Sequence, residues 1–445
     1  MGEDRKIINP IGRRDRFNFH CVLPCQTARI SIDHTLTIQL IDLPLNGYII
    51  LKSSKLGNEK MSTKLDDTFF LDESLKQFYQ HVTEFADTHI KPIAHETDQN
   101  SRFPRELWPL LGKAGLLGVT IGKQYGGSEL GFFEQILAIE AISRASGGIA
   151  LSYTAHANLC SHHLYRYANE SQKEKYLPKL NRGEWVGAIA MSERGAGSDI
   201  MSMQLRAEEK ENHYVLNGHK MWITNGPDAD VLLVYAKTNP EAGPHGITCF
   251  IVEKQFSGFR PNTKLNKLGM RSSNTSELFF ENCIVPKENI LGKLNEGLKL
   301  LVGGLDIERA VISAGPLGLM HACLDVMLPY VKSRKQFNKS LGEFEMIQYK
   351  MADAYTHFQA ARNFVYTIAK LCDQNKLKSE QAAAAYLFTS ETATKLALDT
   401  IQCLGGYGYL NDSDAGRLLR DAKLYEIGAG TTEIRRLVIA RELMK

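Results

Sequence analysis

The sequence predicts a multidomain α+β protein with an N-terminal α-helical domain, a middle β-barrel or β-sandwich domain and a C-terminal four-helix bundle. Its 445 residues are enough for two or three domains, each with its own core. Residues 66–182 and 293–445 carry apolar residues at helical spacing, whereas residues 183–292 consist of short runs rich in β-branched and aromatic residues. We therefore expect the domain boundaries to fall between these three blocks.

Local signals set the expected ends of several elements. Asp72 should cap the first helix, which we expect to stop where Pro92 removes a hydrogen-bond donor. Ser171 should cap the last helix of the first block. In the middle block, Asn217-Gly218 predicts a hairpin turn because both residue types tolerate positive φ. Pro286 should close the β domain.

The third block predicts long helices joined by short connections, which is typical of a bundle. Its helical stretches cover residues 298–337, 346–375 and 379–404, with Pro316 and Pro329 as the expected kinks. At the other end of the chain, residues 1–65 are interpreted as a leader or extension of unknown role. Their five arginines would suit an organelle transit peptide, but acidic residues among them argue against one.

Composition excludes several classes of function. A formal net charge of +3 gives no electrostatic reason to expect nucleic acid or a membrane surface as a partner. No uninterrupted apolar run approaches the roughly 20 residues of a membrane-spanning helix. The eight cysteines include no C-x-x-C pair, so a zinc or disulfide framework is not expected and a reducing compartment fits better. We predict no metal site, and interpret His162 and His163 as packing or surface residues.

Three glycine-containing loops could contact a ligand: residues 190–199, 402–410 and 426–436. The first could equally be a polar interdomain loop and the second a simple helix stop. In the third, Thr431 should cap a helix that has Glu433 in its first turn. Such a helix start favours phosphate or carbonyl oxygen but also occurs without a ligand. None of these loops has the βαβ context of a dinucleotide fingerprint.

Two of these loops carry a resemblance to a known family. AMSERGAGSD (190–199) resembles the first acyl-CoA dehydrogenase signature, and QCLGGYGYLND with the following Arg and Asp, to Asp421, resembles the second. The resemblance covers residues 66–445 in the family's domain order. The segments LDIERAVISAGPLGLM and DAKLYEIGAGTTEIRRLVI look closest to the members that oxidise isovaleryl-CoA.

The resemblance implies FAD, bound without a covalent link between the β domain and the C-terminal bundle. Trp222, Ile223 and Thr224 match the step beside the isoalloxazine ring, and Arg334 matches a residue that holds the cofactor phosphates. The segment 402–406 would reach the FAD of a neighbouring subunit, which implies a homotetramer built as a dimer of dimers. The implied cofactor-binding residues are Ile189, Ala190, Met191, Ser192, Gly197, Ser198, Trp222, Ile223, Thr224, Arg334, Gln402, Cys403, Leu404, Gly405, Gly406, Thr431, Thr432 and Glu433.

The catalytic base is where the sequence departs from most of the family. Most members place a glutamate just before the last helix, where this chain has Ala429. Isovaleryl-type enzymes and a long-chain class carry it on an earlier helix, and LDIER provides Glu308 there. On spacing alone, Glu308 could be an exposed glutamate paired with Arg309 or Arg334. The implied substrate-binding residues are Ser198, Asp306, Ile307, Arg309, Ala429 and Gly430.

The resemblance thus implies oxidation of isovaleryl-CoA to 3-methylcrotonyl-CoA in leucine catabolism, with electrons passed to electron-transfer flavoprotein in the mitochondrial matrix. The alternatives are a dehydrogenase for medium or long straight chains and, from another class, a helical assembly subunit that has lost catalysis. Lys299 and Glu345 depart from the pattern, and touch substrate choice and cofactor affinity respectively.

Overall fold

The computed structural model describes residues 29–31, 37–39 and 71–445 of the chain. It divides the chain into two units, Met1–Phe70 and Leu71–Lys445. In the first unit, β1 (Arg29–Ser31) pairs antiparallel with β2 (Thr37–Gln39). Apart from these strands, the leader or extension predicted for residues 1–65 lies outside the described residues.

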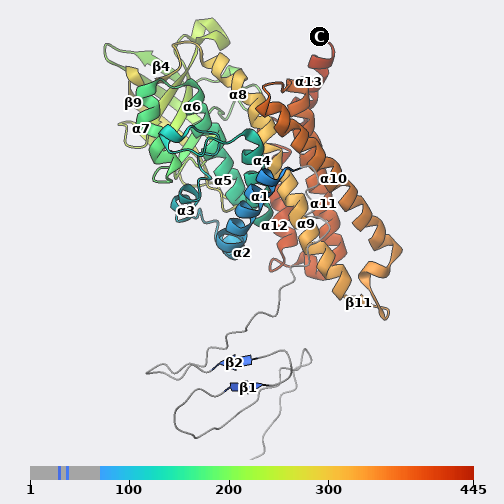
Figure 1. Cartoon of the computed structure of the whole chain (residues 1–445). Coiled ribbons are helices and arrows are strands. Elements are labelled where there is room, and N and C mark those ends of the chain that lie inside the picture. The colour runs from blue at the N-terminus through green and yellow to red at the C-terminus, as the bar shows by residue number, and fades with distance from the viewer. Residues whose placement is uncertain (1–28, 32–36, 40–70) are drawn as a thin grey trace, which may run out of the picture. The chain divides into compact units, whose positions relative to one another are not determined.

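The second unit has the predicted fold class, with helices first, then a sheet, then a second set of helices. In Figure 1 the sheet lies on one side of this unit and the long C-terminal helices on the other, with the N-terminal helices α1, α4 and α5 between them. Helix α4 packs against α9 of the C-terminal set and is buried along most of its length. The N-terminal helices therefore form the shared core that joins the two ends of this unit.

The N-terminal helices begin largely where their capping residues predict. The Asp72 carboxylate accepts a hydrogen bond from the Leu75 N–H at 2.9 Å and caps the first helix. The expected stop at Pro92 is wrong, because the helical conformation continues from α1 through the π-helical turn η1 into α2, and Pro92 lies in the first turn of α2 directly after that irregular turn. Asn169, rather than Ser171, caps the last helix through its bond to the Gln172 N–H. The helices are α1 (Glu73–Phe85), η1 (Ala86–Ile90), α2 (Lys91–Gln99), α3 (Leu107–Lys113), α4 (Phe132–Ala145), α5 (Gly147–Thr154), η3 (Ala155–His162), α6 (His163–Tyr167) and α7 (Glu170–Asn181).

The middle domain is a mixed sheet with the strand order β10-β7-β6-β4-β5-β9-β8, and β3 pairs in parallel with β6. The hairpin predicted at Asn217-Gly218 is wrong, since β5 runs straight through both residues. They form an irregularity opposite β9, where Gly218 has a φ of 137° and the Asn217 side chain bonds Asn282. Pro286 ends β9, but β10 follows it. The strands are β3 (Gly187–Ala190), β4 (Arg206–Glu209), β5 (His213–Thr224), β6 (Val231–Lys237), β7 (Ile247–Glu253), β8 (Phe259–Pro261), β9 (Thr275–Pro286) and β10 (Ile290–Leu291).

Both faces of the central strands are buried, which explains the unbroken apolar runs of β6 and β7. Val231, Leu233 and Tyr235 belong to a core cluster shared with α7 and the first turns of α8. The residues that alternate with them on β6 belong to a second cluster with β5 and β9. This alternation holds the Tyr235 ring on the side of the sheet that faces helices.

The C-terminal block forms long helices, but the stretch expected from 298 to 337 is two helices that meet at Ser313. Pro316 lies in the first turn of the second helix and Pro329 lies inside it. Residues 297–333 are long and apolar enough to cross a membrane, yet 83% of the most apolar window is buried within the fold, as in the core helix of a soluble protein. The elements are α8 (Gly297–Ile312), α9 (Ala314–Ser333), β11 (Lys335–Gln336), β12 (Lys339–Ser340), α10 (Glu345–Asp373), α11 (Ser379–Leu404), α12 (Asp414–Tyr425) and α13 (Thr432–Leu443).

Candidate active site

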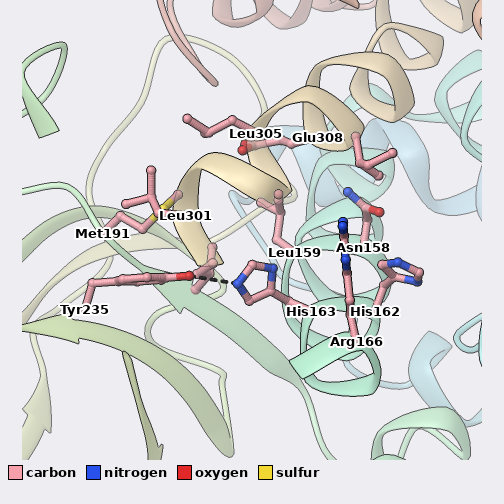
Figure 2. Close-up of a pocket in the computed structure, with 13 residues that line it drawn as sticks. Asn158, Leu159, His162, His163, Arg166, Met191, Tyr235, Leu301, Leu305 and Glu308 are labelled. Atoms are coloured by element: carbon pink, nitrogen blue, oxygen red, sulfur yellow. Dashed lines mark hydrogen bonds between the residues drawn. The ribbon is translucent and has the colours of Figure 1, made fainter. Parts of the chain in front are cut away.

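Glu308 lies on α8 and faces a cavity between α8, the η3–α6 segment and the sheet (Figure 2). Its side chain is buried, with 6% of the residue exposed. One part of the lining is apolar, formed by Leu159, Ile189, Met191, Leu301, Leu305 and Ile307. The remaining lining residues are Asn158, His162, His163, Arg166, Tyr235 and Gly304.

The Glu308 carboxyl makes no hydrogen bond or ion pair with any residue that the structure describes. Burial raises its pKa from 4.5 to about 7, and the nearby positive charge of Arg309 only partly offsets the rise. The alternative of an exposed glutamate paired with arginine is therefore wrong, because Arg309 instead binds Asp306 at 3.0 Å. A buried carboxyl that ionises near neutral pH has the properties of a general base.

The polar part of the cavity was not predicted from the sequence. His163 Nε2 is 2.7 Å from the hydroxyl of Tyr235, and Figure 2 shows this pair on the other side of the cavity from Glu308. His162 Nδ1 is 2.8 Å from the hydroxyl of Thr120. Burial lowers the pKa of His162 to about 4 and that of His163 to about 3, so both rings are neutral at pH 7. The expectation that these histidines pack is compatible with their burial, but they also line the cavity.

The close contact between α8 and α6 depends on two glycines. A Cβ atom added at Gly304 would lie 3.0 Å from Cε1 of His163, and one at Gly303 would lie 2.8 Å from the hydroxyl of Tyr167. These distances are too short for most side chains. Gly303 and Gly304 therefore allow α8 to bring Glu308 close to the histidine-bearing segment, at some cost in helix propensity.

The loop before α13 presents an unusual backbone. Ala429 has a φ of 53° and Gly430 a φ of 84°, and for alanine this conformation costs about 1 kcal/mol or more. The carbonyl of Gly428 accepts hydrogen bonds from the Tyr386 hydroxyl at 3.1 Å and from Arg435 Nη2 at 2.8 Å. These two donors fix the loop together with its own backbone bonds, from the Gly428 N–H to the Leu424 carbonyl at 2.8 Å and from the Thr432 N–H to the Glu426 carbonyl at 3.0 Å.

This anchoring orients the next N–H group. The described chain has no cis peptide bond, so the N–H of Ala429 points away from the carbonyl of Gly428 and from its two donors. That N–H has no hydrogen-bond acceptor among the described residues. Tyr386 lies on α11, which packs against α8, and the charge of Glu308 adds to the rise that burial causes in the pKa of Tyr386. The free N–H and the buried carboxyl are thus parts of one region.

The residues beside Glu308 on α8 make a separate polar contact. Asp306 accepts hydrogen bonds from Arg309 Nη1 and from the Ser379 hydroxyl at the start of α11. Arg309 Nε is buried without a hydrogen-bond partner. Ile307 lines the cavity with Glu308, whereas Ser198 is exposed in the loop after β3. The six predicted substrate-binding residues therefore lie on three segments, the β3 loop, α8 and the loop before α13.

Two predicted cofactor segments lie on neighbouring parts of the sheet. Residues 189–192 end β3 and start the following loop, and the Met221 N–H donates to the Ser192 carbonyl at 2.8 Å. The next residue, Trp222, has a φ of 65° and is 60% exposed. A Cβ atom added at Gly195 or Gly197 would meet nothing within 4 Å. An exposed indole beside an open glycine loop fits a planar aromatic cofactor, and these residues are compatible with FAD.

The third predicted segment lies at the start of α13. Thr431 caps this helix, as predicted, by accepting a hydrogen bond from the Ile434 N–H. Thr432 is buried and its hydroxyl donates to Glu433, which is exposed. This segment follows the loop of Ala429 and Gly430, so it is adjacent to the region that contains Glu308.

The remaining predicted cofactor residues lie elsewhere in the chain. Gly405 follows Ser390, the partner of Arg435, by fifteen residues along α11, which is about 22 Å at 1.5 Å per residue. Gln402, Gly405 and Gly406 are exposed there, while Cys403 and Leu404 are buried in the bundle. Arg334 is exposed at the end of α9, beside the β11–β12 hairpin. A single chain does not bring this group together with Glu308.

Among the described residues, no group of three or more His, Cys, Asp or Glu side chains could hold a metal ion. The six described cysteines are free and buried. The region therefore offers a buried carboxyl, the neutral His163–Tyr235 pair, the Arg166 side chain in the cavity wall and, in the loop before α13, the N–H of Ala429. With a bound redox cofactor, this set can support removal of a proton and a hydride from adjacent carbons.

Comparison with known proteins agrees with this arrangement. Residues 72–184, 188–283 and 295–444 match the family models of the acyl-CoA dehydrogenase N-terminal, middle and C-terminal domains. The chain is 56% identical over 375 residues to the mitochondrial isovaleryl-CoA dehydrogenase of Pongo abelii, covering 83% of this chain and 89% of that protein. It is 50% identical over 403 residues to the mitochondrial 2-methylacyl-CoA dehydrogenase of Solanum tuberosum, covering 90% and 97%. The solved butyryl-CoA dehydrogenase of Megasphaera elsdenii is similar with a TM-score of 0.82 at 34% identity, covering 84% and 99%.

Proposed function

The chain belongs to the acyl-CoA dehydrogenase family, and we propose that it oxidises isovaleryl-CoA to 3-methylcrotonyl-CoA with FAD, as in leucine catabolism. The observation that carries this proposal is the position of Glu308. It is a buried, unpaired carboxyl in a cavity, with a pKa raised to about 7. By the family resemblance, most members carry their catalytic glutamate at the position of Ala429, so we assign proton removal to Glu308 in this chain.

The reaction removes a proton from Cα and a hydride from Cβ of a thioester. We assign the proton to the Glu308 carboxylate, which burial makes a stronger base than an exposed glutamate. The free N–H of Ala429 donates to the thioester oxygen as negative charge develops there, and the two bonds to the Gly428 carbonyl keep that N–H in place. FAD, when bound, supplies the hydride acceptor.

The residues that would hold FAD are those of the β3 loop, Trp222 to Thr224 and the first turn of α13. Arg334 and the 402–406 segment lie too far away in the same chain, so we propose that they serve the cofactor of a second copy in a homotetramer. Asp306 and Arg309 form an ion pair one turn apart on a different face of α8 from Glu308, and Ser379 also bonds Asp306; we propose that this pair helps to place the substrate.

The branched acyl group is supported by the space at Gly428. A Cβ atom added to Gly428 would make only ordinary van der Waals contacts, the nearest with the Leu424 carbonyl oxygen at 3.5 Å, so glycine leaves room for a methyl-sized group at this position. We propose that this volume takes a methyl branch on Cβ. Electron-transfer flavoprotein as acceptor and the mitochondrial matrix as location follow from the family resemblance.

The test is the turnover of isovaleryl-CoA against butyryl-CoA by the purified yellow protein. A higher kcat/KM for isovaleryl-CoA is expected, and Gly428→Tyr should lower it for isovaleryl-CoA much more than for butyryl-CoA. A clear preference of the parent protein for butyryl-CoA would overturn the substrate assignment, but the family assignment would still hold. A colourless protein that binds no FAD would instead favour a non-catalytic assembly subunit.

A further inference from the structure

A buried lysine links the two sheet segments that we assign to the flavin. Lys220 lies on β5, two residues before Trp222, and is fully buried. Its Nζ donates to the Met191 carbonyl at 2.9 Å and to Glu193 Oε1 at 2.8 Å. A full positive charge inside a protein is costly, so this position is stable only because its partners are close and well aligned.

Glu193 extends the link to the end of the loop. Its carboxylate accepts hydrogen bonds from the Gln204 N–H at 2.6 Å and the Leu205 N–H at 2.9 Å. These N–H groups immediately precede β4, so one ion pair joins β5, the start of the loop after β3 and the end of that loop. The loop between them carries the open glycines Gly195 and Gly197.

The same lysine also fixes the strand that bears the exposed indole. The pairing of β5 with β9 is irregular between Lys220 and Ile223, and Trp222 has positive φ within this irregularity. Lys220 therefore lies inside the sheet while the side chain two residues later is exposed. Because Met221 also bonds the Ser192 carbonyl, the strand and the loop are fastened to each other at adjacent residues.

We propose that Lys220 is a positioning residue for FAD: through Met191 and Glu193 it holds the β3 loop and the Trp222 segment in the relative geometry that the flavin requires. It does not contact the reacting atoms. The inference rests on the assignment of FAD to this site. In it, the buried Lys220–Glu193 pair contributes to the geometry of the FAD site as well as to the stability of the fold.

The pair should also make FAD binding sensitive to pH. Burial lowers the pKa of Lys220 to about 8, while the Glu193 charge opposes the decrease. The other titratable group beside it is Cys249 of β7, whose thiol remains neutral because burial raises its pKa. Above pH 8, Lys220 loses its proton and Glu193 is left as an uncompensated buried charge. FAD affinity should therefore fall above pH 8 in the parent protein.

The experiment compares Lys220→Met with a double variant, Lys220→Met/Glu193→Leu. FAD dissociation constants are measured by titration of the apoproteins, together with the Tm of each apoprotein. Loss of hydrogen bonds to a charged group predicts that the single variant binds FAD about tenfold or more weakly. Removal of both charges should restore much of the apoprotein Tm, but FAD binding should remain weak because the loop has lost both anchors.

The matched control is Arg420→Met, which breaks the ion pair with Asp98 between α12 and α2. It should lower the Tm without changing the FAD dissociation constant. Recovery of FAD affinity together with Tm in the double variant would overturn the proposal, because the pair would then be structural only. A parent protein that binds no FAD would instead refute the proposed function, so the two failures are distinguishable.

Discussion

Replacing Glu308 with glutamine should stabilise the folded protein at high pH while it removes the catalytic base. An ordinary glutamate has a pKa of 4.5, whereas burial raises the pKa of Glu308 in the folded protein to about 7, because burial disfavours the charged form. Between these values the folded state binds more protons than the unfolded state, so stability falls as pH rises through this window. At about 1.4 kcal/mol per pKa unit, the full loss is about 3 kcal/mol.

Glutamine cannot ionise and should escape this loss. The Tm of Glu308→Gln minus that of the parent, both saturated with FAD, should therefore be small at pH 5 and should increase steadily to pH 8. Glu391→Gln is the control, because its exposed carboxylate pairs with Arg436 on the surface and its replacement should give no such trend. A Tm difference for Glu308→Gln that stays constant or decreases with pH would refute the conclusion that Glu308 is a buried carboxyl with a raised pKa.

Three further predictions concern catalysis. The kcat/KM for isovaleryl-CoA should rise with pH and level off above about 7, because only the ionised Glu308 can accept the α-proton; a profile that falls across this range would contradict it. Arg435→Met removes a donor from the Gly428 carbonyl and should lower kcat by about tenfold or more while FAD stays bound, and an unchanged kcat would show that the Ala429 N–H needs no such support. Gly304→Val should push α8 away from His163 and reduce kcat/KM, whereas an unaltered value would mean that the cavity tolerates the added bulk.

The sequence predicted those features that depend on local patterns. The three blocks of helix, sheet and helix follow from residue spacing, and the caps at Asp72 and Thr431 follow from side chains that bond N–H groups three residues later. Glu308 was identified because the family resemblance places a glutamate there in isovaleryl-type enzymes, and because Ala429 stands where most members carry that glutamate. In each case the relevant contacts lie within one element or were supplied by the family pattern.

The features that were missed depend on packing between distant residues. His163 and Tyr235 are 72 residues apart, and nothing in either neighbourhood indicates that they share a cavity. Asn217-Gly218 failed as a hairpin signal because the partner strand β9, more than fifty residues later, pairs with β5 on both sides of it. Tertiary pairing therefore overrode the local turn preference.

Charge burial was also invisible in the sequence. Lys220 resembles any strand lysine, yet the fold places it opposite Glu193 with no exposure. The segments 402–406 and 428–433 are close in sequence, but the length of α11 separates them in one chain. Under the proposed function, their common assignment to FAD requires a second copy of the chain, which the sequence of one chain does not describe.

The role of Glu308 as the base is tested most directly by the reduction of the flavin by isovaleryl-CoA in the absence of oxygen. In the parent protein, flavin absorbance should bleach rapidly in a single turnover. In Glu308→Gln, with the same FAD content and an undiminished affinity for a non-reactive acyl-CoA analogue, bleaching should slow by about three orders of magnitude or more, as expected for removal of an essential base. Bleaching of the variant at the parent rate would contradict the account, because another group would then remove the α-proton.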